Sequence, residues 1–310
     1  MARKKAPPRI LWALDPFEKE GETRAHVVSA LQKLTEKRKA IIEPTYVLSP
    51  AEFDLALEFS PPWLKEYKPT TEKILTQALK DIILPGLISP HVLVEKKPSL
   101  RQSIRSLLSY GKRVNADMIA VGTHARNGLS RVLLGSFAET LLLHSRIPLF
   151  ITGAHSSEQG IEHILFATDF GKSANVLFSK VLELAQELGA RITLLHIIPR
   201  PLEPVLQTGV YLLSGGWISL PDFLTQEEKK KQKIAERYAE IAKKQGIPLK
   251  VVIDSSHNSV SHLILQNAKE KNANLIAMAA ESGPIASAVL GSVSRQVVRT
   301  APCPVWIMRA

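Results

Sequence analysis

The sequence predicts an α/β fold built from two similar domains in tandem, each a doubly wound, five-stranded parallel sheet with helices on both faces. Two observations lead to this prediction: the chain repeats itself once, and each repeat alternates short apolar runs with amphipathic segments. Such alternation is typical of a parallel sheet covered by helices. The length of 310 residues suits two domains of ordinary size.

The internal repeat sets the domain organisation. Four segments of the first half recur in the same order in the second half, at offsets of 154 to 157 residues. The matched pairs are 9–15 (RILWALD) with 163–169 (HILFATD), 115–120 (NADMIA) with 272–277 (NANLIA), 133–136 (LLGS) with 289–292 (VLGS), and 147–151 (IPLFI) with 303–307 (CPVWI). We therefore predict one domain over residues 1–154 and a second over 155–310, joined by a short polar linker.

The strands of the first domain are predicted from its apolar runs. A run of four to eight apolar residues bounded by polar or turn residues is typical of a buried strand. Their order, with helical segments between them, is that of a Rossmann-like sheet. The predicted strands are Ile10–Leu14, Ile41–Leu48, His91–Val94, Met118–Val121 and Leu149–Thr152, with a long crossover over residues 49–87.

The second domain repeats this order with clearer helix boundaries. Gly189 and Gly246 each follow a run of helical spacing and predict where those helices end. The predicted strands are Ile164–Thr168, Arg191–Ile198, Leu249–Ile253, Leu275–Ala279 and Pro304–Met308. The predicted helices are Ser173–Leu188, Gln226–Gln245, Ser259–Lys271 and Val293–Thr300, with a long loop over residues 200–224.

Composition excludes several classes of protein. Cys303 is the single cysteine, so the chain can form neither an intrachain disulfide nor a metal site of several cysteines. No apolar run reaches the roughly 18 residues of a membrane span, and no apolar segment of a signal peptide follows the basic N-terminus. We therefore expect a cytoplasmic protein that has no membrane partner.

The net charge of +11 is shared unevenly between the domains. Residues 1–154 hold 23 basic and 15 acidic residues, whereas residues 155–310 hold 17 and 14. Nucleic acid, an acidic membrane surface or a phosphorylated ligand would each favour such a balance. Because basic and acidic residues are interspersed, we expect no specific nucleic-acid partner; a small phosphorylated ligand of the first domain explains the excess at least as well.

The loop after the fourth strand of the first domain carries the clearest motif. Ligands of open parallel sheets bind outside the carboxyl ends of the strands, and this loop begins at Gly122 and ends at Gly135-Ser136. Glycine lets backbone amides approach phosphate oxygens closely. The helix predicted to open at Gly135-Ser136 offers free N–H groups to an anion, and Ser136 can cap that helix or donate its hydroxyl to a phosphate.

This loop resembles the signature of the universal stress protein family, Gly-x2-Gly-x9-Gly-Ser/Thr. Gly122, Gly135 and Ser136 match the signature, and Ala125 stands in place of its second glycine. Residues 165–169, 193–198 and 301–307 resemble other strands of the same family. The resemblance covers almost the whole chain twice, and so implies a tandem universal stress protein with a role in stress response or regulation.

The resemblance also implies a nucleotide site in the first domain only. In the ATP-binding branch of the family, the signature loop holds the phosphates and ribose, and the ends of the first and second strands contact the nucleoside. Carried over by position, the implied ligand-binding residues for ATP with Mg²⁺ are Asp15, Val47, Gly122, Ala125, Gly135, Ser136 and Phe137. Arg126 adds positive charge to this loop, or is an ordinary surface residue.

The second domain departs further from the signature. Ala279 and Ser282 replace the two glycines, the loop is one residue shorter, and Glu281 adds a negative charge. We expect this copy to bind triphosphate poorly and Gly291-Ser292 to remain as a helix cap.

Other polar and aromatic residues have ordinary interpretations. Asp15 and Asp169 either contact a ligand or Mg²⁺, or cap the helix that follows. His196 is interpreted as a core histidine with its hydrogen bonds satisfied. Trp63 and Trp217 lie in the second crossovers, where they line a ligand cavity or pack beneath the loop.

The sequence contains no catalytic motif, so we expect no enzyme, with slow ATP hydrolysis left as an alternative. A second functional alternative is a nucleotide-free scaffold, or a binder of other small molecules, that acts through its long crossover loops. The family resemblance further implies pairing through the last strands, 149–152 and 304–308. In a tandem chain this pairing gives an internal pseudo-dimer, and pairing of two chains into a homodimer remains open.

Overall fold

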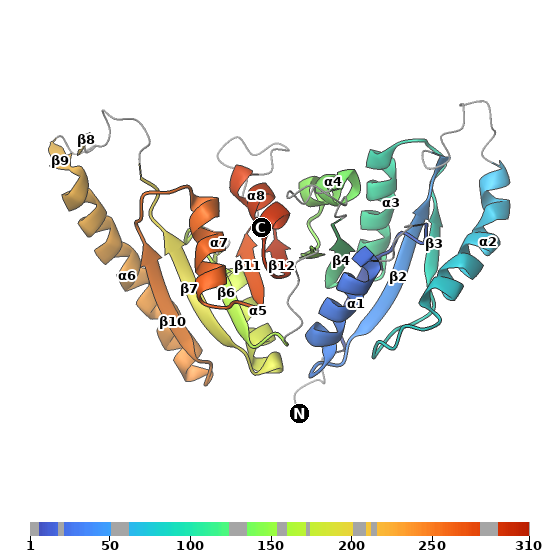
Figure 1. Cartoon of the computed structure of the whole chain (residues 1–310), viewed down its shortest axis with the longest axis horizontal. Coiled ribbons are helices and arrows are strands. Elements are labelled where there is room, and N and C mark those ends of the chain that lie inside the picture. The colour runs from blue at the N-terminus through green and yellow to red at the C-terminus, as the bar shows by residue number, and fades with distance from the viewer. Residues whose placement is uncertain are drawn as a thin grey trace.

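The structure is a computed structural model of the 310-residue chain. The two repeats lie side by side in it, with the first repeat at the right of Figure 1 and the second at the left. The described residues are 6–17, 22–50, 62–123, 135–153, 160–171, 174–200, 209–211, 216–279 and 291–309.

The first repeat follows the predicted order of strands and helices. Its elements are β1 (Arg9–Ala13), α1 (Glu22–Thr35), β2 (Ile41–Leu48), α2 (Pro62–Leu79), β3 (His91–Val94), α3 (Leu100–Arg113), β4 (Met118–Gly122), α4 (Ser136–His144) and β5 (Leu149–Thr152). Each predicted strand is confirmed to within one residue at either end. The long crossover over residues 49–87 contains the 18-residue helix α2, with Pro69 inside it.

The second repeat has the same order with one addition. Its elements are β6 (His163–Ala167), α5 (Ala174–Leu188), β7 (Arg191–Ile197), β8 (Gly209–Tyr211), β9 (Trp217–Ser219), α6 (Leu220–Lys244), β10 (Leu249–Asp254), α7 (Val260–Glu270), β11 (Leu275–Ala279), α8 (Ser292–Thr300) and β12 (Val305–Met308). The ribbon of β8 and β9 lies in a stretch that the sequence predicts as loop.

The predicted start of the long second-repeat helix at Gln226 is wrong. Helix α6 begins at Leu220, because the Ser219 hydroxyl accepts a hydrogen bond from the Asp222 amide and Pro221 lies in the first turn. Serine at the N-cap and proline in the first turn are both typical helix starts. Two aromatic residues of the second crossovers are about half exposed. Trp217 lies on β9 with 57% of its surface exposed, and Tyr67 of the first repeat lies on α2 with 49% exposed.

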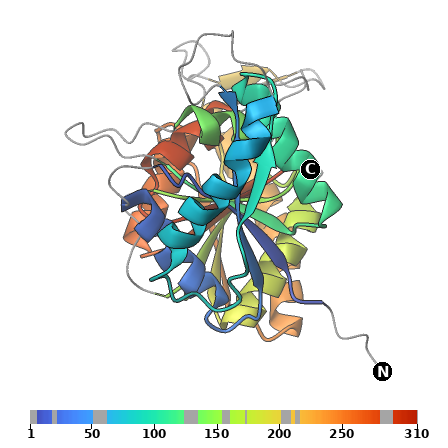
Figure 2. The same cartoon turned by 90° about the vertical axis from the view of Figure 1, so that its right-hand side faces the viewer.

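Ten of the described strands form one continuous sheet in the order β10-β7-β6-β11-β12-β5-β4-β1-β2-β3. Within each half all neighbouring strands are parallel, so each half contributes the predicted five-stranded parallel sheet. The halves join through β5 and β12, which pair antiparallel with Phe150 opposite Trp306. Seen from the β3 end, the strands fan out between layers of helices (Figure 2).

Helices cover both faces of the sheet and define two apolar cores. Alternate residues of a strand point to opposite faces, so Trp12 enters the core under α1, α2, α5 and α6, whereas Leu11 enters the core under α3, α4, α7 and α8. In the second repeat Phe166 enters the same core as Trp12, and Leu165 enters the same core as Leu11. Both cores run across the two halves.

The junction of the two halves is bridged on both faces. On one face Glu139 of α4 lies 3.2 Å from Arg295 and 3.6 Å from Arg299 of α8, where the two helices meet above the sheet centre (Figure 1). On the other face Arg38, just after α1, lies 3.1 Å from Glu187 of α5. Because these ion pairs are partly exposed to solvent, they contribute little to the stability of the chain and serve mainly to orient the two halves.

Candidate functional site

The carboxyl ends of the strands place several predicted site residues at one edge of each half. Asp15 follows β1, is exposed, and its Oδ1 accepts a hydrogen bond of 2.9 Å from the Phe17 amide. Asp169 follows β6 in the same way and accepts a bond of 2.8 Å from the Gly171 amide. Both aspartates thus close a short turn at the end of a strand, several residues before α1 begins at Glu22 and α5 begins at Ala174.

Gly122 lies at the end of β4, where its lack of a side chain is required by packing. A Cβ atom built on Gly122 would lie 2.2 Å from Cγ2 of Thr23 and 3.0 Å from Cγ2 of Val27, both on α1. Any other residue would force the Thr23 side chain or α1 itself to shift. The first glycine of the signature therefore has a structural reason besides the approach of a ligand to the backbone.

Gly135, Ser136 and Phe137 form the start of α4. Gly135 occupies the N-cap position, with φ −58° and ψ 148°, and Ser136 is the first helical residue, with an exposed side chain. Ser136 is therefore not the N-cap of the helix, and its hydroxyl lies beside the free amides of the first turn. Gly291 takes the equivalent N-cap position of α8, ahead of Ser292.

Val47 is placed differently from the other residues. Its side chain is 4% exposed and belongs to the core under α3 and α4, against which Phe137 also packs. It therefore forms part of the floor beneath the strand ends. The predicted residues Ala125 and Arg126, with His124 and Arg131, lie outside the described residues, as do Glu281 and Ser282 of the second repeat.

The second repeat shows that the equivalent residues surround one space. The described part of this half has a cavity of about 250 Å³ at the carboxyl ends of β6, β7 and β11. Its lining includes the counterparts of six predicted first-repeat residues: Asp169 for Asp15, Ile197 for Val47, Ala279 for Gly122, Gly291 for Gly135, Ser292 for Ser136 and Val293 for Phe137. The second-repeat counterparts of the residues that the family resemblance assigns to a ligand thus line one cavity.

The turn that carries Asp169 has an unusual backbone. Phe170 has a φ of 60°, in a region that aromatic residues rarely adopt. Its ring lies 4.8 Å from that of His196 and 5.5 Å from that of Tyr238, and Lys231 lies 5.9 Å above it. These contacts hold the turn, and with it Asp169, at the rim of the cavity. No sequence pattern pointed to Phe170, whose counterpart in the first repeat is Pro16.

His196 has the predicted role of a satisfied core histidine. It is 5% exposed, and its Nδ1 donates a hydrogen bond of 2.8 Å to the carbonyl oxygen of Thr168. Burial lowers the pKa of His196 below its ordinary value of 6.5; the bond to Thr168 opposes this shift, and nearby Lys231 adds to it. A neutral ring is therefore part of the folded state.

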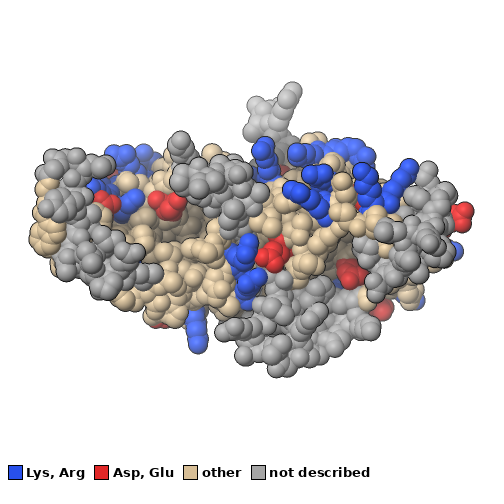
Figure 3. All heavy atoms as spheres, turned by 90° about the horizontal axis from the view of Figure 1, so that it is seen from above, with Lys and Arg blue, Asp and Glu red and all other residues tan. Residues whose placement is uncertain are grey.

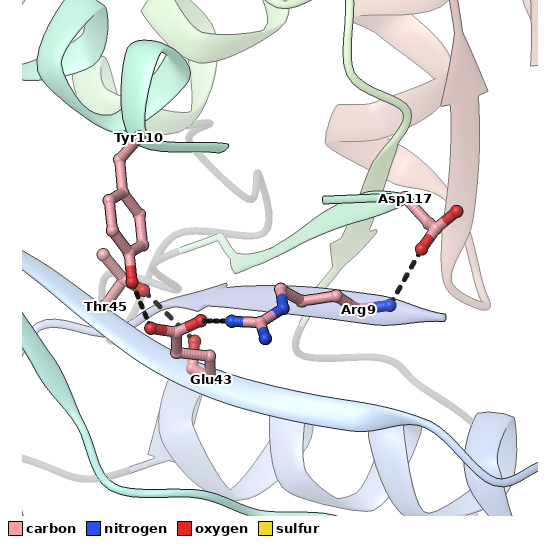
Figure 4. A network of polar contacts seen from close by, with 5 residues as sticks. All are labelled: Arg9, Glu43, Thr45, Tyr110 and Asp117. Carbon is pink, nitrogen blue, oxygen red and sulfur yellow. Dashed lines mark hydrogen bonds and ion pairs between the residues drawn. The ribbon is translucent and has the colours of Figure 1, made fainter. Parts of the chain in front are cut away.

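A second polar cluster, which the sequence did not reveal, lies at the opposite edge of the first repeat. Glu43 of β2 is 4% exposed, accepts a hydrogen bond from the Tyr110 hydroxyl, and pairs with Arg9 at 2.6 Å (Figure 4). The Tyr110 ring stacks on His91 with centroids 4.4 Å apart. Burial, reinforced by the bond to Glu43, raises the pKa of Tyr110 to about 12. Glu43 is 34 and 67 residues from its partners, so no local motif marks it.

The second repeat fills the same positions without an ion pair. His163 replaces Arg9 and Thr193 replaces Glu43 in the strand register. His163 Nδ1 donates to the Lys271 carbonyl oxygen at 2.9 Å, so in the neutral ring Nε2 accepts from the Thr193 hydroxyl at 2.8 Å. Burial, with a contribution from Arg191, lowers the pKa of His163 below 6.5. This edge therefore serves the fold in both halves.

Two features are absent from the described residues. None of the described helices is long and apolar enough to span a membrane. No group of three or more His, Cys, Asp and Glu side chains comes together there in a way that would hold a metal ion.

The fold and the strand-end cavity together define a tandem, doubly wound α/β protein with a small-molecule-sized hollow at the carboxyl edge of its sheet. The chain belongs to the universal stress protein family, whose model matches residues 8–153 and again residues 160–309. The two matches confirm the tandem arrangement and the family resemblance of the sequence.

Individual relatives are distant in sequence. A universal stress protein of Mycolicibacterium smegmatis (strain ATCC 700084 / mc(2)155) is 25% identical over 248 residues, which cover 76% of this chain and 75% of the relative. The crystal structure of a universal stress protein from Archaeoglobus fulgidus DSM 4304 is similar with a TM-score of 0.68 and 18% identity, covering 97% of this chain and 98% of that one. A functionally unknown protein from Pseudomonas aeruginosa PAO1 gives a TM-score of 0.58 at 14% identity, covering 98% and 93%. These structures share the whole two-repeat fold.

Proposed function

We propose that this tandem universal stress protein is a stress-response regulator that binds ATP or a related nucleotide at the carboxyl edge of its first repeat. The observation that carries the proposal is the convergence in the second repeat, where counterparts of Asp15, Gly122, Gly135 and Ser136 surround one cavity. The strand register is the same in both halves, so the first-repeat residues occupy the corresponding positions.

Charge favours the first repeat as the phosphate-binding one. Its signature loop contains His124, Arg126 and Arg131, whereas the corresponding segment 280–290 contains Glu281 and no basic residue. Lys and Arg side chains also gather on the half of the molecule that holds the first repeat (Figure 3). Together with the helix N-terminus at Gly135-Ser136, this charge supports an anionic ligand.

The proposed role of the nucleotide is binding and not turnover. Occupancy of the first-repeat site would change the affinity of the protein for a partner, and the proposed compartment is the cytoplasm. Asp15 would face the Mg²⁺ ion or the ribose, and Ser136 and the amides of α4 would face the phosphates. ATP hydrolysis above that of a Ser136→Ala control would contradict a purely regulatory role.

The test is equilibrium dialysis of the full chain with labelled ATP and Mg²⁺. We expect saturable binding with one high-affinity site, lost in Gly135→Val, because the added side chain occupies the space in front of the first helical turn. The matched control is Gly291→Val, which makes the same change in the second repeat and leaves ATP binding unchanged. Absence of binding at millimolar ATP, or equal losses in both variants, would overturn the proposal.

The alternative role as a nucleotide-free scaffold has one observation in its favour. Trp217 on β9 and Tyr67 on α2 are each about half exposed, and both lie in the second crossovers. Exposed aromatic side chains are common where proteins bind partners. If Gly135→Val keeps partner binding while Trp217→Ala loses it, the crossovers and not the nucleotide site carry the function.

A further inference from the structure

We propose that helix α3 of the first repeat carries a docking surface for duplex nucleic acid, which contacts the phosphate backbone without reading the base sequence. Six exposed cations on α3 and just before it form this α3 basic surface: Lys96, Lys97, Arg101, Arg105, Lys112 and Arg113. The inference goes beyond the proposed function, because the surface uses none of the residues assigned to the nucleotide.

Three of these cations form a straight row along α3. Arg105 and Lys112 follow Arg101 by four and eleven residues. On a helix of about 3.6 residues per turn, this spacing places all three within about 40° of one another. The row is about 16 Å long, because each helical residue adds about 1.5 Å. Ile104 and Leu107 bury the opposite side of the helix in the core, so the row points to solvent.

Little negative charge lies close enough to neutralise the row. Residues 96–113 include six basic and no acidic residues, and none of the six forms an ion pair with another described residue. Glu95 is turned to its own surroundings, because it accepts hydrogen bonds from the Ser106 hydroxyl at 2.5 Å and the Lys97 amide at 3.1 Å. Glu139 of the adjoining helix α4 pairs with two arginines of α8. The result is a local excess of positive charge, on the half of the molecule where Lys and Arg gather (Figure 3).

The packing of the helix does not explain these cations, because the second repeat lacks them. Asn115 and Asn272 align the two repeats, since they follow α3 and α7 and have similar positive φ values of 52° and 50°. Counted back from Asn272, the positions equivalent to the four cations within α3 hold, in order, Asn258, His262, Lys269 and Glu270. The same helix position thus folds without a basic row, which leaves a partner as the reason for the row in the first repeat.

The length of the row favours an extended polyanion over a small anion. A single phosphate group cannot touch cations that are about 16 Å apart along the helix axis. Duplex DNA carries about one charge per 1.7 Å of its axis, so a stretch of the same length presents several phosphates on each strand. A row of this kind therefore suits a nucleic-acid backbone.

The side chains around the row favour a duplex over a membrane or a single strand. Helices that bind a membrane surface expose an apolar face, and none of the large exposed apolar residues of the described chain lies on α3. Proteins that bind single strands stack the bases on aromatic side chains, whereas Tyr110 of α3 is buried and stacked on His91. What remains is ionic contact with phosphates, which positions a duplex but carries no sequence information.

The experiment measures fluorescence anisotropy of a labelled DNA duplex titrated with the full chain at about 50–200 mM salt. We expect saturable binding at the lowest salt, and a slope of about −4 for log affinity against log salt, as four to five phosphate contacts require. The double variant Arg101→Gln/Arg105→Gln loses two of these contacts. It should reduce the slope by about 2 and lower the affinity at about 50 mM salt at least tenfold. Duplexes of unrelated base sequence should bind equally well.

The matched control is Lys243→Gln/Lys244→Gln, which removes the same net charge from the exposed end of α6. This helix packs against β10, at the other end of the sheet, so the salt slope should stay unchanged. Circular dichroism checks that both double variants are folded. Equal losses in the two double variants would show that net charge alone drives binding, and would overturn the assignment to α3.

Three further outcomes would overturn the inference. These are absence of duplex binding at about 50 mM salt, tighter binding to a single strand of the same sequence, and tighter binding to phosphatidylserine vesicles than to the duplex. ATP binding should be unchanged in Arg101→Gln/Arg105→Gln, and duplex binding should be unchanged in Gly135→Val. The inference and the proposed function therefore fail separately.

Discussion

Asp117 and Asn274 occupy equivalent positions in the two repeats, and each accepts a hydrogen bond from the backbone amide that opens the neighbouring strand. Asp117 Oδ2 accepts from the Arg9 amide at 2.8 Å, and Asn274 Oδ1 accepts from the His163 amide at 3.1 Å. In both repeats the backbone amide of the Asp or Asn donates in return to the carbonyl oxygen of the same strand residue. A shared hydrogen-bond role is thus filled by a charged side chain in one half and a neutral one in the other.

The exchange of these two side chains should not be symmetrical. Asn274 is 8% exposed whereas Asp117 is exposed, so Asn274→Asp buries a carboxylate and Asp117→Asn does not. We expect Asn274→Asp to lower the free energy of unfolding by about 1–3 kcal/mol and Asp117→Asn by less than about 1 kcal/mol. Urea unfolding of both variants at neutral pH measures the difference. Equal losses would show that burial does not decide the effect.

The packing of Gly122 against α1 gives a second matched pair. Gly122→Ala places a methyl group 2.2 Å from Thr23, and overpacking of this kind costs about 1–3 kcal/mol. Ala279→Gly, the reverse change in the second repeat, should cost no more than about 1 kcal/mol, because it only adds backbone freedom. Chemical unfolding compares the two. A Gly122→Ala variant as stable as the wild-type chain would mean that Thr23 or α1 adjusts without cost.

Alkaline stability should report on Tyr110. Its pKa is raised from 10.0 to about 12 in the folded chain, so the unfolded chain loses the hydroxyl proton first as pH rises. The stability contributed by the protonated hydroxyl is therefore complete below pH 10 and is lost between pH 10 and about 12. Denaturant midpoints measured at intervals across this range should fall less steeply in Tyr110→Phe than in the wild-type chain. Denaturant midpoints that fall equally with pH in the variant and the wild-type chain would rule out Tyr110 as a source of the stability lost at alkaline pH.

Acid stability should depend on the buried histidines. Burial lowers the pKa of His196 below 6.5, so protonation favours the unfolded chain. The stability contributed by the neutral ring is present above pH 6.5 and is lost as pH falls through the lower pKa of the folded state. His163 and His91 shift in the same direction, again mainly through burial. Unfolding midpoints at pH 7.5 and about 5.5 should differ less in His196→Gln than in the wild-type chain, and an equal difference would exclude His196.

The strands were predictable because local and repeated signals coincide in them. Residues 10–14 and 164–167 are apolar, and each run is followed by an aspartate, at 15 and at 169. The two runs recur at one spacing, so their strand assignment needs no knowledge of tertiary contacts. The bounds of helix α2 could not be predicted, because Pro69 lies inside it and proline usually argues against a helix interior. The start of α6 was missed although Ser219, Pro221 and Asp222 carry an ordinary helix-start pattern.

The residues at the candidate site could be named from the sequence, but the shape of the cavity could not. The aspartate after the first strand and the glycine-serine pair could be recognised from the sequence, because the aspartate directly follows an apolar run and the pair matches the end of a family signature. The role of the buried Glu43 could not be recognised, because its partner Tyr110 lies far away along the chain. The positive φ of Phe170 could not be recognised either, because it depends on packing against Tyr238. That the second-repeat counterparts form a cavity follows only from the fold.

The antiparallel pairing of β5 with β12 within one chain has a consequence for divergence. In a homodimer of one-domain chains that paired through this strand, every substitution would be present in both domains. The association of the two chains would also depend on protein concentration. Here the two partners are covalently joined, so the junction forms at a fixed local concentration and dilution does not separate it. A difference between equivalent positions, such as Gly122 and Ala279 or Asp117 and Asn274, is then present once per molecule. One half can thereby change at such a position while the other keeps its residue.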